Sequence, residues 1–426
     1  MHILSKSTYI KGEQCEKALY LFKNRPFLRD KLSMEQRAKF KRGTDVGILA
    51  QQCFPNGINM TPSSPSLFSK KADETMQNLN NPDVNVMYEA VFQYDDTLIM
   101  LDIIVRDCDK WRAIEVKSSL SISPTYMKDA ALQYYVLKGC NVPLSDIQLM
   151  YINADYVKNG DLDLTQLFVF QSVKEYAEKY QDVIAKNIAY FKDIIKQPHS
   201  PKINIGNQCD TPYRCEFHGH CWKDVPNEAD KPYTIDYKSL YEFIGDKKQS
   251  TAFLNLLFYR PAVPLFDGDK PYTEFIIAFS ILSNNGQFDH IYNWNCLDDL
   301  SQWKNCMELL DEQLAGFERV VCFAPQNITA SLQRFNLLKS KDLNYKIYNL
   351  LEVLKQSDFH HENVKTDFSL KNVYESVFPD KKLFEHSRII LNALSDNPME
   401  RSLITNDLES ENKALREIYK KVINIL

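Results

Sequence analysis

The chain has 426 residues, and 51 Lys and Arg against 56 Asp and Glu give it a formal net charge of −5. A hydrophobic fraction of 44% excludes a disordered chain. Only 12 glycines exclude a collagen-like or Gly-rich linker protein. The mild acidity excludes a protein that is basic throughout, but it permits a nucleic-acid enzyme with a local basic surface. The length predicts two or three domains.

The N-terminal region departs from this average charge. Its first 45 residues hold eleven Lys and Arg against five Asp and Glu. Residues 7–22 and 34–54 are each predicted to form a helix, and the second is ended by the turn signal Pro55-Asn56-Gly57. Basic residues on such helices form either a solvated face or a surface that follows phosphates. The sequence leaves both interpretations open.

The hydrophobic pattern then changes to the period of a strand. Residues 84–94, 97–106 and 111–117 are rich in β-branched, aromatic and aliphatic residues, and Asp-containing turn signals separate them. They predict a meander of three strands. The predicted elements that follow are a helix at 124–139, a strand at 147–154 and a long helix at 173–196. This order predicts an α/β core.

Asp102, Glu115 and Lys117 give the strongest chemical signal. Glu115 and Lys117 lie two residues apart on one predicted strand, so their side chains share a face. A short hairpin brings Asp102 of the preceding strand beside them. Two carboxylates can bind a hard cation such as Mg²⁺ or Mn²⁺, and a lysine can hold a water and offset charge on a phosphate. An ordinary ion pair on a solvent-facing strand is the alternative, but the neighbouring residues of this strand are apolar.

This D…E-x-K pattern is followed by a helix that carries Gln133-Tyr134-Tyr135. Over roughly residues 1–225 the chain resembles the RecB-like branch of the PD-(D/E)XK nuclease superfamily. The resemblance implies a restriction-endonuclease-like fold. It implies metal binding by Asp102, Glu115 and Val116, and catalytic roles for Asp102, Glu115, Lys117, Gln133 and Tyr134.

Two positions qualify this resemblance. Many RecB-like enzymes carry a metal-binding His in an N-terminal helix, and Gly47 stands at the matching place here. This leaves fewer protein ligands and argues against a two-metal site. Glu89 lies one predicted strand away from the carboxylate pair, and we expect it to be structural rather than catalytic.

Three cysteines, Cys209, Cys215 and Cys221, fall within thirteen residues of an irregular segment. Clustered cysteines in a reducing compartment usually bind metal, and Cys15 is the candidate fourth ligand. The residues alone fit zinc, with or without a nearby histidine, or an iron–sulphur cluster. Iron–sulphur RecB-like nucleases, such as the CRISPR adaptation nuclease and AddB, place one Cys before the core and three after it. The resemblance therefore implies a structural 4Fe–4S cluster on these four cysteines.

The predicted domains are residues 1–230 and residues 231–426. The chain is similar to a bacterial family in which this nuclease precedes a DnaQ-like exonuclease domain. The stretches that carry the similarity are Leu4-Ser5-Lys6-Ser7, Phe54-Pro55-Asn56-Gly57 and 261–268. That similarity implies a second α/β domain of RNase H-like fold. Asn255 and Leu257 stand where Asp and Glu would hold two metal ions. We therefore expect the second domain to have lost catalysis and to bind nucleic acid or a protein partner, or to buttress the first.

The sequence thus predicts a Mg²⁺- or Mn²⁺-dependent DNA nuclease that acts on single-stranded or end-containing DNA, in repair or in defence against mobile elements. The alternatives are an RNA nuclease and a catalytically weak or inactive nucleic-acid-binding scaffold. No signal peptide is visible and no run approaches 18 apolar residues. We therefore expect a cytoplasmic protein with no membrane partner.

Overall fold

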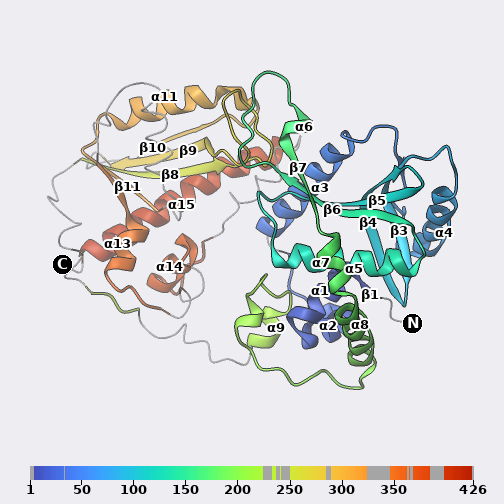
Figure 1. Cartoon of the computed structure of the whole chain (residues 1–426). Coiled ribbons are helices and arrows are strands. Elements are labelled where there is room, and N and C mark those ends of the chain that lie inside the picture. The colour runs from blue at the N-terminus through green and yellow to red at the C-terminus, as the bar shows by residue number, and fades with distance from the viewer. Residues whose placement is uncertain are drawn as a thin grey trace. The chain divides into compact units, whose positions relative to one another are not determined.

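The structure is a computed structural model, and it describes residues 4–32, 34–223, 233–236, 240, 250–284, 289–323, 346–361, 364, 368–383 and 398–424. The chain divides into two compact units. One unit comprises Met1–Val225 with Pro261–Thr273, and the other comprises Pro226–Arg260 with Glu274–Leu426. Each combines helices with a mixed β-sheet (Figure 1), which confirms the predicted α/β class. Within the described residues, no helix is both long enough and apolar enough to cross a membrane.

The first unit begins with a short strand and helices, continues into a sheet, and ends in an irregular segment. Its elements in chain order are β1 (Leu4–Ser5), α1 (Lys6–Gln14), α2 (Glu16–Asn24), η1 (Pro26–Leu28), α3 (Met34–Gln51), β2 (Ile58–Asn59), η2 (Pro65–Leu67), α4 (Phe68–Leu79), β3 (Val86–Tyr94), β4 (Thr97–Asp107), β5 (Lys110–Lys117), α5 (Pro124–Gly139), β6 (Leu144–Ile152), α6 (Leu164–Leu167), β7 (Phe168–Ser172), α7 (Lys174–Lys179), α8 (Gln181–Lys196), η3 (Asn207–Cys209) and α9 (His218–Trp222).

The sheet of this unit has seven strands in the order β2-β3-β4-β5-β6-β7, and β1 pairs with β4 outside that path. Strands β3, β4 and β5 form an antiparallel meander. Strand β6 is parallel to β5, because α5 makes the crossover between them. The predicted meander, helix and following strand are therefore confirmed. The core is built from α5 and alternate strand residues, among them Met87, Leu101, Trp111, Ala113, Leu132 and Leu149.

Strands β1 and β5 share one edge of β4. Strand β3 pairs with the opposite edge from Thr97 to Val105, except at Asp102. On the shared edge, β1 pairs with Thr97 and Leu98, and β5 pairs with 103–107. In the described sheet, the backbone of 99–102 therefore has no strand partner on that edge. This gap lies beside Asp102.

Two predicted helices are each divided in the structure. Residues 173–196 form α7 and α8, which meet at Tyr180. Residues 7–22 form α1 and α2, which meet at Cys15 in extended conformation, with φ −162° and ψ 116°. The amide of Gln14, the last residue of α1, donates to the carbonyls of Gln208 at 2.8 Å and Tyr213 at 2.6 Å. Contacts with a distant loop therefore fix the chain at this break, and a helical period cannot reveal them.

The segment Pro261–Thr273 packs with the first unit, although the sequence places it in the second region. Ala262 is buried in a cluster of apolar residues from the first unit. The Tyr272 hydroxyl donates to the carbonyl of Ser118, and Lys158 forms an ion pair with Asp267 at 3.0 Å. These contacts tie the segment to the loop that follows β5 and to the loop that follows β6.

The second unit contains a five-stranded sheet in the order β10-β9-β8-β11-β12. Strand β9 is antiparallel to β8 and β10, and β8, β11 and β12 run parallel. The described elements are β8 (Thr251–Tyr259), β9 (Phe275–Asn284), β10 (Asp289–Asn295), η5 (Leu300–Gln302), α11 (Trp303–Leu314), β11 (Arg319–Cys322), β12 (Lys346–Asn349), α13 (Leu350–Gln356), α14 (Leu370–Val377) and α15 (Pro398–Asn424).

Asn412 of α15 is buried and joins this helix to the sheet. Its amide donates to the carbonyls of Phe253 and Ser280, both at 2.8 Å.

We expect Asn412→Ala to lower the free energy of unfolding of the second unit by about 2 kcal/mol, because two buried carbonyls lose their donor. Urea unfolding measures this change. The exposed Asn406 of the same helix supplies the control Asn406→Ala, which should shift the free energy by less than about 0.5 kcal/mol. Equal effects of the two substitutions would contradict the anchoring role.

Candidate active site and cysteine pocket

Asp102 and Glu115 lie where the ladder between β4 and β5 stops. The last pair is Ile103 with Ile114, so an extended register would place Asp102 directly opposite Glu115. Instead, the Asp102 carboxylate accepts the backbone N–H of Val116 at 2.6 Å. The N–H and C=O of one residue in an antiparallel strand point to the same edge. The carbonyl of Val116 therefore faces the same gap as Asp102.

Glu115 is 1% exposed and forms the centre of a polar cluster. One of its carboxylate oxygens accepts from the ammonium groups of Lys6 at 2.6 Å and Lys117 at 2.7 Å. Its other oxygen accepts from the amide of Gln133 at 2.7 Å. Lys6 reaches Glu115 because β1, which immediately precedes it, is held against β4. The structure thus brings the predicted residues Glu115, Lys117 and Gln133 together.

Asp129 of α5 extends this cluster. Its carboxylate accepts from Lys117 at 2.6 Å and lies 3.9 Å from Lys6. The Lys117 ammonium also lies 4.9 Å from the centre of the Tyr126 ring. Two lysines are therefore shared between two carboxylates, in a setting where an uncompensated charge would be costly.

The charges in the cluster change the acidity of its members. Burial would raise the pKa of Glu115, but Lys117 and Lys6 outweigh burial and hold its pKa below the ordinary range. Burial would lower the pKa of Lys117, but Asp129 and Glu115 raise it. Burial and the nearby Glu115 raise the pKa of Asp102 to about 8. Lys6 and Lys117 lower the pKa of Asp102, but burial and Glu115 outweigh them.

The donor set of this gap fits a hard divalent cation. Asp102, Glu115 and the Val116 carbonyl offer oxygen atoms, which are the ligands that Mg²⁺ and Mn²⁺ prefer. Two further buried oxygens, Asp129 Oδ1 and Gln133 Oε1, accept no hydrogen bond within the described part of the chain. A buried acceptor without a donor is costly. A cation with its waters would supply what these oxygens lack.

Glu89 lies closer to this site than the sequence suggests. In the register of β3 and β4 it falls opposite Asp102, but the pair is skipped. Its φ of +51° places it in the left-handed region, which is unfavourable for a residue other than glycine. Burial and Glu115 raise its pKa. Glu89, Asp102 and Glu115 thus form a row across three neighbouring strands.

Two further sequence positions lie apart from the cluster. The hydroxyl of Tyr134 donates to Glu178 of α7 at 3.0 Å, so it points away from Glu115. This geometry gives no support to the expected catalytic role of Tyr134. Gly47 of α3 has open space where a side chain would begin, because no atom outside its own stretch of helix lies within 4 Å of that position.

Lys6 and Asp129 also belong to the site, although the sequence pattern did not predict them. Asp129 stands four residues before Gln133 on one helix, so the two share a face. That spacing was a usable signal. Lys6 is separated from Glu115 by 109 residues, and no local pattern links the two.

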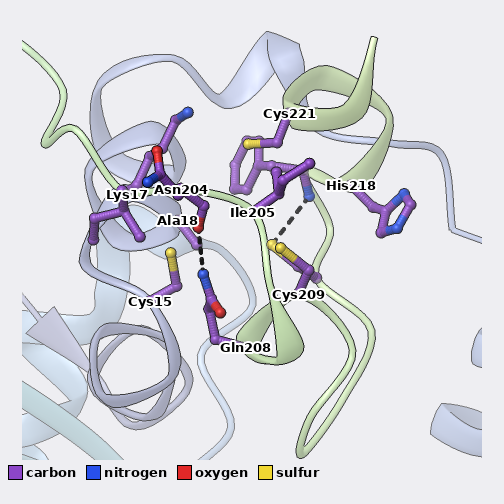
Figure 2. A pocket seen from close by; sticks show the side chains of 12 residues that line it. Cys15, Lys17, Ala18, Asn204, Ile205, Gln208, Cys209, His218 and Cys221 are labelled. Atoms are coloured by element: carbon purple, nitrogen blue, oxygen red, sulfur yellow. Dashed lines mark hydrogen bonds between the residues drawn. The ribbon is translucent and has the colours of Figure 1, made fainter. Parts of the chain in front are cut away.

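The four predicted cysteine ligands, Cys15, Cys209, Cys215 and Cys221, line one pocket. Figure 2 shows the labelled thiols of Cys15, Cys209 and Cys221 around this pocket, with Cys15 approaching from the break between α1 and α2. The His218 ring points away from it and stacks on Trp222 at 4.9 Å. The backbone N–H of Phe217 donates to the Cys215 sulphur at 3.5 Å. The pocket therefore combines thiols from both ends of the first unit.

The chemistry of this pocket suits a thiophilic metal group. Burial raises the pKa of Cys15 and raises that of Cys215 to about 11. These thiols are therefore neutral at pH 7 until a cation stabilises their thiolates. Four sulphur donors fit zinc or an iron–sulphur cluster. In the described part of the chain, no group of three or more His, Cys, Asp or Glu side chains is arranged to hold a metal ion as it stands.

Asn255 of the second unit has a structural partner. Its amide donates to Glu411 of α15 at 2.7 Å and to the carbonyl of Leu408 at 3.3 Å. Leu257, two residues further along β8, is buried. At the position where an Asp-x-Glu pair would hold metal, β8 therefore carries Asn255, which binds α15, and Leu257, which is part of the core.

Comparison with known proteins does not identify the chain. No protein-family model matches it, and no curated protein matches its sequence. The geometry of the carboxylate–lysine cluster and of the cysteine pocket therefore carries the functional argument.

Lys6 offers a test of the cluster. We expect Lys6→Met to lower the free energy of unfolding by about 1 to 2 kcal/mol, because Glu115 and Asp129 lose one of their two cations. The same substitution should cost less in a Glu115→Gln background, and the difference measures their coupling. Lys70, whose side chain is 73% exposed and pairs with Glu74, supplies the control Lys70→Met, with an effect near zero. Additive effects at Lys6 and Glu115 would contradict the cluster.

Proposed function

We propose that the first unit is a divalent-metal-dependent DNA nuclease of the RecB-like PD-(D/E)XK type. The supporting observation is the gap beside β4, where the Asp102 carboxylate accepts the backbone N–H of Val116 and Lys117 lies next to Glu115. A divalent cation bound there would act as a Lewis acid on a phosphate oxygen and lower the pKa of a bound water.

The residues around the gap have separate tasks in this proposal. Gln133 fixes the second oxygen of Glu115, so the carboxylate presents a defined orientation. Lys117 holds the attacking water by hydrogen bonding and offsets negative charge that develops on the phosphate. Lys6 offsets the charge of Glu115 and Asp129, which allows Lys117 to exchange one carboxylate for substrate.

We further propose that the cysteine pocket holds a structural 4Fe–4S cluster. Its four ligands come from Cys15 at the start of the unit and from three cysteines at its end. A cluster would therefore connect the break between α1 and α2 to the C-terminal loop, where Gln14 already makes two hydrogen bonds. Zinc is the alternative occupant, since it also takes four thiolates.

The second unit fits a degenerate RNase H-like domain in this proposal. Its strand order, with β9 as the antiparallel member, supports such a fold. Asn255 and Leu257 supply neither of the two expected carboxylates. We propose that this unit serves binding, to nucleic acid or to a protein partner, rather than hydrolysis.

A nucleic-acid-binding scaffold is the competing function. One observation favours it: Lys6 and Lys117 already compensate Glu115 and Asp129, so the cluster is largely neutral as it stands. A cleavage assay separates the two functions.

For the nuclease, we expect Mn²⁺-dependent cleavage of single-stranded DNA with free ends that stops when EDTA is added. Asp102→Ala and Lys117→Ala should each reduce the rate at least about 100-fold, because each removes a group that acts on the reacting phosphate. The controls Asp73→Ala and Lys70→Ala change an exposed acid and an exposed lysine of α4 and should leave the rate unchanged. Parallel RNA and duplex DNA substrates define the preferred nucleic acid. Equal cleavage by wild type and both site variants would reject the nuclease, and binding without cleavage would favour the scaffold.

For the cluster, we expect anaerobically purified protein to be brown and to contain iron and sulphide. Replacing Cys15 or Cys221 by Ser should remove the colour and most of the iron, because each supplies one of four ligands. Cys108 is exposed and lies outside the pocket, so Cys108→Ser is the matched control. Colourless protein with stoichiometric zinc would replace the iron–sulphur proposal with a zinc site.

A further inference from the structure

Helix α3 has a buried face and an exposed face. Val46 and Ala50 pack into the apolar core of the first unit. On the opposite side, Phe40 is 58% exposed and Ile48 is 56% exposed. An amphipathic helix normally places polar residues on the face that meets water. Two large apolar side chains there, about two turns apart, indicate a surface that contacts something else.

The same helix is positively charged. Its described charged side chains are Arg37, Lys39, Lys41 and Arg42 against Asp45, which lies 3.5 Å from Lys41. Arg37 shares the exposed face with Phe40, three residues further on, and Lys41 shares it with Arg37, four residues before it, and with Ile48, seven residues after it. A basic surface with interspersed apolar groups complements a polyanion that also exposes flat apolar rings. Single-stranded DNA has both features, because its phosphates are charged and its bases are not hidden in a duplex.

The packed side of α3 is connected to the candidate active site. The guanidinium of Arg42 lies 5.5 Å from the centre of the Tyr272 ring. The Tyr272 hydroxyl donates to the carbonyl of Ser118, the residue that follows Lys117. Lys39 lies 4.8 Å from the centre of the Tyr213 ring, in the cysteine loop. Helix α3 is therefore connected, through Tyr272, to the end of β5 and, through Tyr213, to the cysteine loop.

We propose that the exposed face of α3 binds single-stranded DNA and leads it to the carboxylate–lysine site. Arg37 and Lys41 contact phosphates, and Phe40 and Ile48 contact bases. This inference rests on the proposed function in one respect, because the proposed nuclease site is the place to which the strand is led. The binding step does not require cleavage, so the two can be tested apart. A lipid surface is a poorer fit, because a membrane-binding helix needs a broad apolar face.

Gly47 supplies a substitution that adds a negative charge to the side of the helix that carries Phe40, seven residues before it. Outside its own stretch of helix, no atom lies within 4 Å of the position where its side chain would begin, so a glutamate side chain meets open space. Glutamate also favours the helix more than glycine does. Gly47→Glu should therefore leave the melting temperature at or above that of wild type and weaken DNA binding, because its carboxylate repels the phosphates.

The experiment measures fluorescence anisotropy of a labelled oligothymidylate of about 20 nucleotides with the full-length protein in EDTA. The double variant Phe40→Ala, Ile48→Ala should raise the Kd at least about tenfold, because base contacts are lost. The double variant Arg37→Gln, Lys41→Gln should lower the slope of log Kd against log salt by about 1.4, since two phosphate contacts are lost. The controls on α8 and α4, Tyr190→Ala and Lys70→Gln, remove an exposed aromatic ring and an exposed lysine and should leave Kd unchanged.

Several results would overturn the inference. They are an unchanged Kd in all α3 variants, tighter binding of duplex than of single-stranded DNA, and binding to phosphatidylserine vesicles with none to the oligonucleotide. If wild-type protein binds DNA through α3 but cleaves nothing with Mn²⁺, the inference stands and the proposed nuclease fails. If it cleaves DNA and the α3 variants bind and cleave like wild type, the inference alone fails.

Discussion

The buried carboxylate of Glu115 is the constraint around which the first unit is organised. A charge that is 1% exposed must be compensated within the protein. Lys6, Lys117 and Gln133 provide that compensation, and they come from the start of α1, the end of β5 and the middle of α5. Three elements are therefore held in register by one side chain. Neither lysine forms an ion pair with Asp102 among the described contacts, and its carboxylate accepts the backbone N–H of Val116 instead.

The gap in the sheet explains why this chemistry is located beside β4. Strands β1 and β5 both pair with one edge of β4 but leave 99–102 uncovered. Backbone groups at such a gap need other partners, and the Asp102 side chain supplies one to Val116. A continuous ladder would have used those groups for strand pairing. An interrupted ladder leaves those groups without a strand partner, and at the opposite edge of β4 the left-handed backbone of Glu89 interrupts the pairing with β3.

The N-terminal helices connect the two candidate sites. Lys6 at the start of α1 contacts Glu115, and Gln14 at its end contacts the loop that carries Cys209 and Cys215. Cys15 follows at once and lines the cysteine pocket. Any group bound between these cysteines therefore holds the helix that supplies Lys6. The basic helix α3 is tied to the same region through Tyr213 and Tyr272. In this way one short N-terminal region reaches the carboxylates, the cysteines and the exposed basic surface.

The sequence by itself determined the elements with a strong local period: the meander, α5, and the shared face of Glu115 and Lys117. These follow from spacings of two and of three to four residues, which are properties of neighbouring positions. The tertiary structure alone decided which distant groups meet. Lys6 joins Glu115 across 109 residues, the loop contacts of Gln14 divide a predicted helix, and Pro261–Thr273 returns to the first unit. Such contacts depend on how elements pack, and a local period carries no information about the partner of a side chain once the chain has turned back on itself.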